Sequence, residues 1–107
     1  MVTHRFDVFR NPNAAAAKHI PFLLVLQSEL LSELPTRVVA PLARANAIKG
    51  PSATMLNPEF EIGAARVVML TQQIAAVPLD ILRKHEINLE TQREAILRAL
   101  DFLFNGI

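Results

Sequence analysis

The sequence predicts a small, mostly antiparallel β-sheet closed by one long C-terminal helix. Short segments with alternating or nearly continuous apolar residues recur between residues 3 and 71, and turns containing proline, glycine or asparagine separate them, as is typical of strands. Residues 90–107 alone carry apolar residues at helical spacing over a long stretch. We therefore expect about five strands and one helix. A chain of 107 residues has no room for a second core, so residues 1–107 are expected to form a single domain.

Three strands are expected in the first half of the chain. Residues 3–9 alternate between polar and apolar side chains, which suits a half-buried strand. After a loop over residues 11–18, residues 20–27 are apolar at nearly every position, which predicts a central strand buried on both faces. Residues 37–40 form the third strand. Pro41 marks an edge or a bulge in it, because proline has no N–H to donate.

The second half is expected to contain a hairpin and a turn before the helix. Residues 60–62 and 66–71 form the hairpin, with Gly63 at the tight connection. The proline within residues 77–82 predicts a short helix or a turn. Residues 83–85 then form a short basic loop, which is more often soluble surface than a contact with DNA.

The C-terminal segment is predicted to be an amphipathic helix with one apolar and one polar side. The apolar side is expected to face the core and contains Ile96, Leu97, Ala99, Leu100, Leu103, Phe104 and Ile107. The polar side faces solvent or a partner and contains Glu94, Arg98, Asp101 and Asn105. At the helix entry, Thr91 and Glu94 have the spacing of a capping box, and Asn88 offers a second N-cap.

Some residues have no role that a core would explain. Phe102 lies off both sides of the predicted helix, which suggests a subunit contact. Two adjacent leucines, Leu30 and Leu31, follow the predicted central strand in a polar turn region. Gly106 would ordinarily cap a helix, yet only Ile107 follows it. Such an ending suits a surface that docks onto another molecule.

Composition and charge exclude several classes of protein. A hydrophobic fraction of 51% is high for a chain this short and favours self-association. The 11 basic and 10 acidic residues are spread along the chain, so there is no basic stripe of the kind that binds phosphates. The absence of cysteine excludes disulfides and thiolate metal sites.

The N-terminus lacks the apolar core of a signal peptide, and the longest apolar run, residues 20–26, is too short to span a bilayer. A soluble cytoplasmic protein without membrane contact is therefore expected.

No residues form a convincing catalytic or metal site. His4, His19 and His85 are scattered, and none has a second ligand at helical or hairpin spacing. Glu90 and Glu94 lie four residues apart on the predicted helix, but such a pair on an outward face is usually solvated. We therefore expect no metal, no cofactor and no catalytic residue.

Four segments in series resemble the CcdB family of bacterial toxins, the gyrase poisons of toxin–antitoxin modules. They are VLQSELL at residues 25–31, RVVAPLA at residues 37–43, MLTQQIAAVP at residues 69–78, and the ending at residues 101–107. Each segment alone is a weak signal, but their order and spacing cover nearly the whole chain.

The resemblance implies a homodimer built on an SH3-like barrel with a long terminal helix. In the family, the two terminal helices lie together and present their ends to the A subunit of DNA gyrase. The toxin holds gyrase on cleaved DNA and catalyses no reaction itself. A cognate antitoxin of the CcdA type binds through a segment that folds on the toxin and competes with gyrase.

The resemblance also assigns roles to residues. The gyrase-binding positions are Ser28, Leu30, Leu31, Asp101, Asn105, Gly106 and Ile107. Phe102 and Leu103 are expected in the dimer interface. The best-known member of the family has a tryptophan where this chain has Asn105, and that ring stacks on an arginine of gyrase. Asparagine cannot supply this stack.

Two other functions are compatible with the same fold. One is an endoribonuclease toxin of the MazF/Kid type, which would need an acid, a base and a cation converging on RNA. The other is a non-toxic CcdB homologue that only binds antitoxin, which the substitution at Asn105 suggests.

Overall fold

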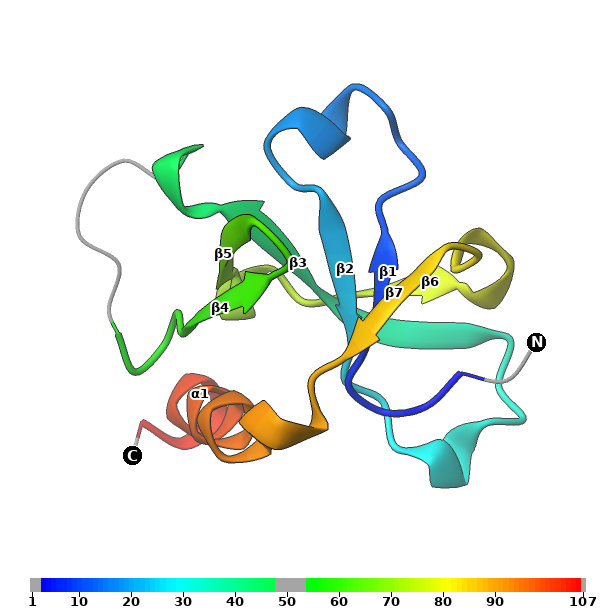
Figure 1. Cartoon of the computed structure of the whole chain (residues 1–107). Helices are drawn as coiled ribbons and strands as arrows, with labels where there is room; N and C mark the ends of the chain where they lie inside the picture. Colours follow the sequence, from blue (N-terminus) through cyan, green and yellow to red (C-terminus); the bar gives the residue numbers. More distant parts are fainter. Residues whose placement is uncertain (1–2, 48–53, 107) are drawn as a thin grey trace.

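The computed structural model describes residues 3–47 and 54–106. These residues form a seven-stranded antiparallel sheet that curls into a half-barrel, with one helix packed against it (Figure 1). The predicted fold class is confirmed, and the curled sheet fits an SH3-like barrel. The elements are β1 (Asp7–Arg10), β2 (Phe22–Val25), β3 (Thr36–Arg44), β4 (Glu59–Ile62), β5 (Ala65–Met69), β6 (Ala75–Pro78), β7 (His85–Asn88) and α1 (Arg93–Asn105).

The longest strand, β3, has partners on both edges. One edge pairs with β2. The other edge pairs with β6 over residues 36–39 and with β5 over residues 42–44. Pro41 lies where the partner changes, and its carbonyl accepts from the Leu70 N–H at 2.9 Å. The predicted irregularity at Pro41 is therefore a change of partner along an interior strand, where the missing N–H breaks no ladder bond.

Buried side chains lie on both faces of the sheet. The larger group includes Phe6 and Leu24 and packs against Ile96 of α1. The smaller group contains Phe9, Val25, Val39 and Leu82. Because Leu24 and Val25 are neighbours in β2 and belong to different groups, the prediction that this strand is buried on both faces is confirmed.

Two of the seven strands, β6 and β7, were not predicted. The expected helix or turn over residues 77–82 is correct only in part, because β6 ends at Pro78 and a 3₁₀ turn follows over Leu79–Ile81. The basic loop is shorter than expected, since His85 already belongs to β7. Both strands are short and largely exposed, so they lack the burial of one face that produces an alternating pattern.

The first strand begins later than predicted, because a turn precedes it. The Asp7 N–H donates to the His4 carbonyl at 3.1 Å, and Phe6 has a φ of 73°, a region that bulky residues rarely adopt. The Phe6 ring is fully buried, its N–H donates to the Val25 carbonyl at 2.8 Å, and its own carbonyl accepts from the Leu89 N–H at 2.9 Å. Packing and backbone bonds therefore hold Phe6 in this strained conformation.

The C-terminal helix starts with a 3₁₀ turn over Glu90–Gln92. The predicted N-cap at Asn88 is wrong, because Leu89 occupies the N-cap of this turn, although Asn88 Oδ1 does accept from the Glu90 N–H at 2.8 Å. The predicted capping box at Thr91 is wrong, since Gln92 occupies the N-cap of α1 and makes no side-chain cap bond. At the other end Gly106 is an ordinary left-handed cap, with φ 75° and its N–H bonded to the Phe102 carbonyl.

The apolar side of α1 is only partly buried. Ile96 and Ala99 are fully buried, whereas Phe104 is 68% exposed and was wrongly expected in the core. The polar side is exposed as predicted, and Ile107 lies outside the described residues.

Candidate docking surface

Residues 28–34 between β2 and β3, here called the docking loop, expose three leucines. Ser28 Oγ accepts from the Leu30 N–H at 3.2 Å and so caps a 3₁₀ turn over Glu29–Leu31. The exposed fractions are 93% for Leu30, 50% for Leu31 and 47% for Leu34. The docking loop therefore presents an apolar surface, as expected for its adjacent leucines.

The docking loop is held in place by a buried arginine. Arg37, at the start of β3, is 5% exposed. Its guanidinium donates to the carbonyls of Ser32 and Leu34, at 3.0 and 2.7 Å, and to Thr3 Oγ1 at 2.9 Å. A further bond runs to the Thr36 carbonyl. All four acceptors are neutral oxygens, so the charge is accommodated by hydrogen bonds alone.

Gln27 provides a second support for the docking loop. Its Oε1 accepts from the Val38 N–H at 3.1 Å, and its Nε2 donates to the carbonyls of Leu31 and Thr36, both at 3.2 Å. The amide therefore links the two ends of the docking loop where pairing between β2 and β3 stops. Together with Arg37 it fixes the backbone under the exposed leucines.

An ion pair connects the docking loop to the turn before β1. Nδ1 of His4 donates to Oε1 of Glu29 at 2.8 Å, and both side chains are exposed. This hydrogen bond, followed by the charge of the carboxylate, raises the pKa of His4. The same hydrogen bond lowers the pKa of Glu29.

The turn before β1 is anchored to β7 through Asp7, which is 3% exposed. Its carboxylate accepts from the backbone N–H of His4, from Nε2 of His85 and from Nδ2 of Asn88, at 2.7, 3.0 and 3.0 Å. Burial alone would raise the pKa of Asp7, but these hydrogen bonds outweigh it and hold the pKa below its usual value. The pair of Asp7 and His85 is thus part of the scaffold.

The other predicted docking residues lie at the end of α1. Asp101, Asn105 and Gly106 are exposed, while Phe102 and Leu103 are half-buried. Residues 101–106 are here called the helix end, and they also include the exposed ring of Phe104.

The structure does not bring the two groups of predicted docking residues together within one chain. Figure 1 shows the docking loop and the helix end on opposite sides of the molecule. The docking loop instead borders the beginning of α1. A surface pocket of about 400 Å³ there is lined by His4, Ser28, Leu30 and Arg93, among others.

Sequence reasoning missed four residues of this surface. Leu34 follows Leu30 by four residues in the same polar turn region, and this repetition was a usable signal. Arg37 lies on the same inward side of β3 as Val39. The alternation of side chains along a strand was therefore a signal that Arg37 is buried. Gln27 and Phe104 gave no sequence signal, since their roles depend on where β3 ends and on what packs beside the end of α1.

Two findings limit the chemistry of the described residues. Residues 3–47 and 54–106 contain no group of three histidine or acidic side chains that could hold a metal ion. No helix in these ranges is long and apolar enough to cross a membrane.

Comparison with known proteins gives one match. The family model described as CcdB protein matches residues 5–106, which include the docking loop and the helix end. No curated protein matches the sequence.

Replacing Arg37 by methionine is expected to destabilise the protein and loosen the docking loop. The change leaves the Ser32 and Leu34 carbonyls without their donors, so the free energy of unfolding should fall by about 2–3 kcal/mol. Urea denaturation measures this loss, and hydrogen exchange should locate the faster amides in residues 28–36. Arg66→Met is the control. Arg66 is exposed and reaches Glu61 only at 3.7 Å, so this change should cost less than about 0.5 kcal/mol. Equal losses in the two variants would contradict the role given to Arg37.

The pKa of His4 is expected to lie above 6.5, the ordinary value for a histidine, because Glu29 stabilises the imidazolium. The stability contributed by the pair is fully present between pH 4.5, the ordinary pKa of a glutamate, and pH 6.5. It is lost as the pH rises through the raised pKa of His4 and as the pH falls through the lowered pKa of Glu29. An NMR titration of the His4 ring measures the value. Glu29→Gln should return it toward 6.5, whereas Glu33→Gln, which changes a neighbouring exposed carboxylate, should leave it unchanged. A His4 pKa unaffected by Glu29→Gln would refute the assignment.

Proposed function

The chain belongs to the CcdB family, and from this premise we propose that it binds the A subunit of DNA gyrase and traps the complex of gyrase with cleaved DNA. Members of this family are toxins of toxin–antitoxin modules that poison gyrase. The proposed action is binding alone, by a single domain in the cytoplasm, without a catalysed reaction. The contacting residues would be Ser28, Leu30 and Leu31 in the docking loop and Asp101, Asn105, Gly106 and Ile107 at the end of the chain.

The observation that supports this proposal best is the exposure of Leu30 on a fixed backbone. A leucine 93% exposed gains nothing from folding, whereas burial against a partner stabilises a complex by about 1.5–3 kcal/mol. Arg37 and Gln27 hold the backbone beneath it, so little conformational entropy is lost when a partner binds.

A homodimer would explain the exposed aromatic ring of the helix end. Phe104 is 68% exposed and lies near the half-buried Phe102 and Leu103. If the α1 helices of two copies lie together, these side chains are covered and the two helix ends form one continuous surface. We propose Phe102 and Leu103 as interface residues and add Phe104 to them.

The same surface suits the antitoxin expected of the family. A segment of a CcdA-like antitoxin that folds on the docking loop would cover Leu30 and Leu31, so gyrase could not bind at the same time. Competition of this kind would neutralise the toxin.

A second candidate function, RNA cleavage of the MazF/Kid type, has one observation in its favour. The pocket beside the docking loop contains the His4–Glu29 pair together with Arg5 and Arg93. However, both guanidinium groups lie over the buried Phe6 ring, at 5.0 and 5.7 Å from its centroid, which gives them a structural role. RNA cleavage by the purified protein that is lost in His4→Ala would favour this candidate over gyrase binding.

The central test is binding of the purified protein to the dimerisation region of gyrase A, measured by calorimetry. Leu30→Ser should weaken binding by more than about tenfold, as expected for an apolar hot spot. A variant lacking Asn105, Gly106 and Ile107 should bind no better than Leu30→Ser. Met55→Ser is the control, because it removes an apolar side chain that is 46% exposed and belongs to neither the docking loop nor the helix end. Absence of binding by the unchanged protein would overturn the proposal.

Sedimentation equilibrium on the same samples should give the mass of two chains, and a monomer at micromolar concentration would contradict the dimer.

Asn105→Trp is expected to strengthen gyrase binding. Asn105 is exposed at the helix end, and a ring there would restore the stacking on arginine that the family's best-known member uses, a contact worth about 2 kcal/mol or more when desolvated. Calorimetry should show a Kd lower by at least about tenfold. Arg98→Trp, at another exposed position of α1, is the control. Equal or weaker binding by Asn105→Trp would count against this alignment of the helix end with the family.

A further inference from the structure

A cavity of about 580 Å³ lies away from the docking surface. It is bounded by the loop between β1 and β2, by the last residue of β3 and by the segment that leads into β7. Figure 1 shows the loop between β1 and β2 at the opposite end of the molecule from α1 and the docking loop. The cavity is lined by Arg10, Asn11, Pro12, Ala14, Ala17, Pro21, Phe22, Arg44, Ile81, Arg83 and Lys84.

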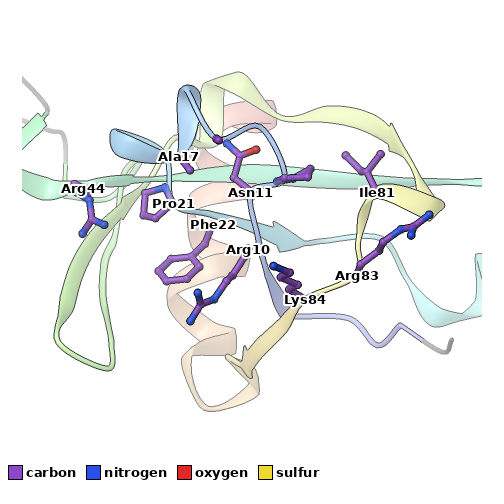
Figure 2. A pocket seen from close by; sticks show the side chains of 11 residues that line it. Arg10, Asn11, Ala17, Pro21, Phe22, Arg44, Ile81, Arg83 and Lys84 are labelled. Atoms are coloured by element: carbon purple, nitrogen blue, oxygen red, sulfur yellow. The ribbon is translucent and has the colours of Figure 1, made fainter.

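The middle of this cavity is apolar. Pro21 is buried and Phe22 beside it is half-buried, so part of the Phe22 ring stays accessible, while the half-buried Ile81 lies farther along, beside Arg83 (Figure 2). Pro12 and Ala17 add to this surface from the loop between β1 and β2. An apolar side chain of a ligand would pack against this surface and make apolar contacts that water cannot make.

Cationic side chains surround the apolar surface on two sides. In Figure 2 Arg44 lies on one side of Phe22, and Arg83 and Lys84 lie on the other, with Arg10 next to the ring. Among the described residues, no acidic side chain lines the cavity. Arg10 has a carboxylate partner outside the lining, Glu86, which accepts from Arg10 Nε at 2.8 Å. Three of the four cations therefore have no carboxylate partner among the described residues.

Two of the arginines are oriented with their terminal nitrogens available. Nε of Arg44 donates to the Lys18 carbonyl at 3.2 Å, and Nε of Arg83 donates to the Asp80 carbonyl at 2.7 Å. These bonds limit the rotation of both side chains. Within residues 3–47 and 54–106, the NH1 and NH2 groups of these two arginines make no hydrogen bond. A guanidinium fixed through Nε can still bind a carboxylate through its terminal nitrogens.

We propose that this cavity binds an acidic peptide segment of another protein. One apolar side chain of the segment rests on Phe22, and carboxylates before and after it pair with Arg44 on one side and with Arg83 and Lys84 on the other. The formal charge of the whole chain is only +1, so this concentration of cations is a local property that selects an anionic partner. The site is separate from the proposed gyrase contact, and its occupation does not depend on that function.

The arrangement favours a peptide over a nucleic acid. Single-stranded nucleic acids are usually bound by a continuous basic groove with several aromatic rings on which successive bases stack. Here Phe22 is the one aromatic lining residue in the part of the chain that the structure describes, and Arg44 is separated from Arg83 and Lys84 by apolar surface. Peptide side chains, in contrast, alternate readily between apolar and acidic groups.

The test uses a fluorescent synthetic peptide in which one phenylalanine is flanked on both sides by glutamates, added to the full-length protein. Fluorescence anisotropy should show saturable binding that weakens as salt is raised. Arg44→Gln and Arg83→Gln should each weaken it by about tenfold, the effect of losing one charge-assisted hydrogen bond. Arg98→Gln, which removes an exposed arginine from α1, should bind like the unchanged protein.

Each remaining outcome decides the proposal. Binding that is lost when the glutamates are replaced by glutamines, or the phenylalanine by serine, supports both parts of the site. No saturable binding, or equal losses in Arg44→Gln and Arg98→Gln, overturns it. Tighter binding of a single-stranded oligonucleotide that depends on Arg44 and Arg83 also overturns it, in favour of a nucleic-acid site. Gyrase binding, measured on the same Arg44 and Arg83 variants, should be unchanged, so failure here is distinguishable from failure of the proposed function.

Discussion

The pairing of β3 with three other strands is the constraint on which the rest of the molecule depends. Its register with β2 and β6 fixes the first half of the strand, and its register with β2 and β5 fixes the second half. Each end of β3 carries an arginine. Arg37 at one end bonds the docking loop, and Arg44 at the other borders the cationic cavity. A shift of this strand by one residue would exchange its inward and outward side chains and dismantle both surfaces.

The docking loop shows how exposed apolar residues can be kept in one conformation. Leu30, Leu31 and Leu34 cannot hold themselves in place, since half or more of the surface of two of them and nearly half of the third is in contact with water. The order comes from polar groups beneath them. Arg37 and Gln27 donate hydrogen bonds to backbone carbonyls of the docking loop, which would otherwise need water as their donor. A fixed loop of this kind loses less entropy on binding than a mobile one.

The sequence was sufficient for those parts of the fold that follow from local patterns. The interior strand β2 is a nearly continuous apolar run and the helix α1 has strong periodicity, so both were predictable. The short exposed strands β6 and β7 were not, because they form only where a partner strand offers free N–H and C=O groups. The exposure of Phe104 depends on what packs beside the end of α1, and the cationic cavity depends on three segments that are distant along the chain. These are tertiary properties, and the periodicity of a single segment carries no information about them.

The two outermost strands of the sheet have a consequence for how copies of this protein can associate. β4 and β7 each have only four residues, and each places acidic side chains on its surface, among them Glu59, Glu61 and Glu86. In addition, the register of β7 against β1 shifts between Val8 and Phe9. Short, charged and irregular edges disfavour the addition of further strands. These two edges are thereby protected from the open-ended addition of strands, which matters for a chain with a hydrophobic fraction of 51%. At these edges, contact between copies is left to side-chain surfaces, which can close on a second copy and stop.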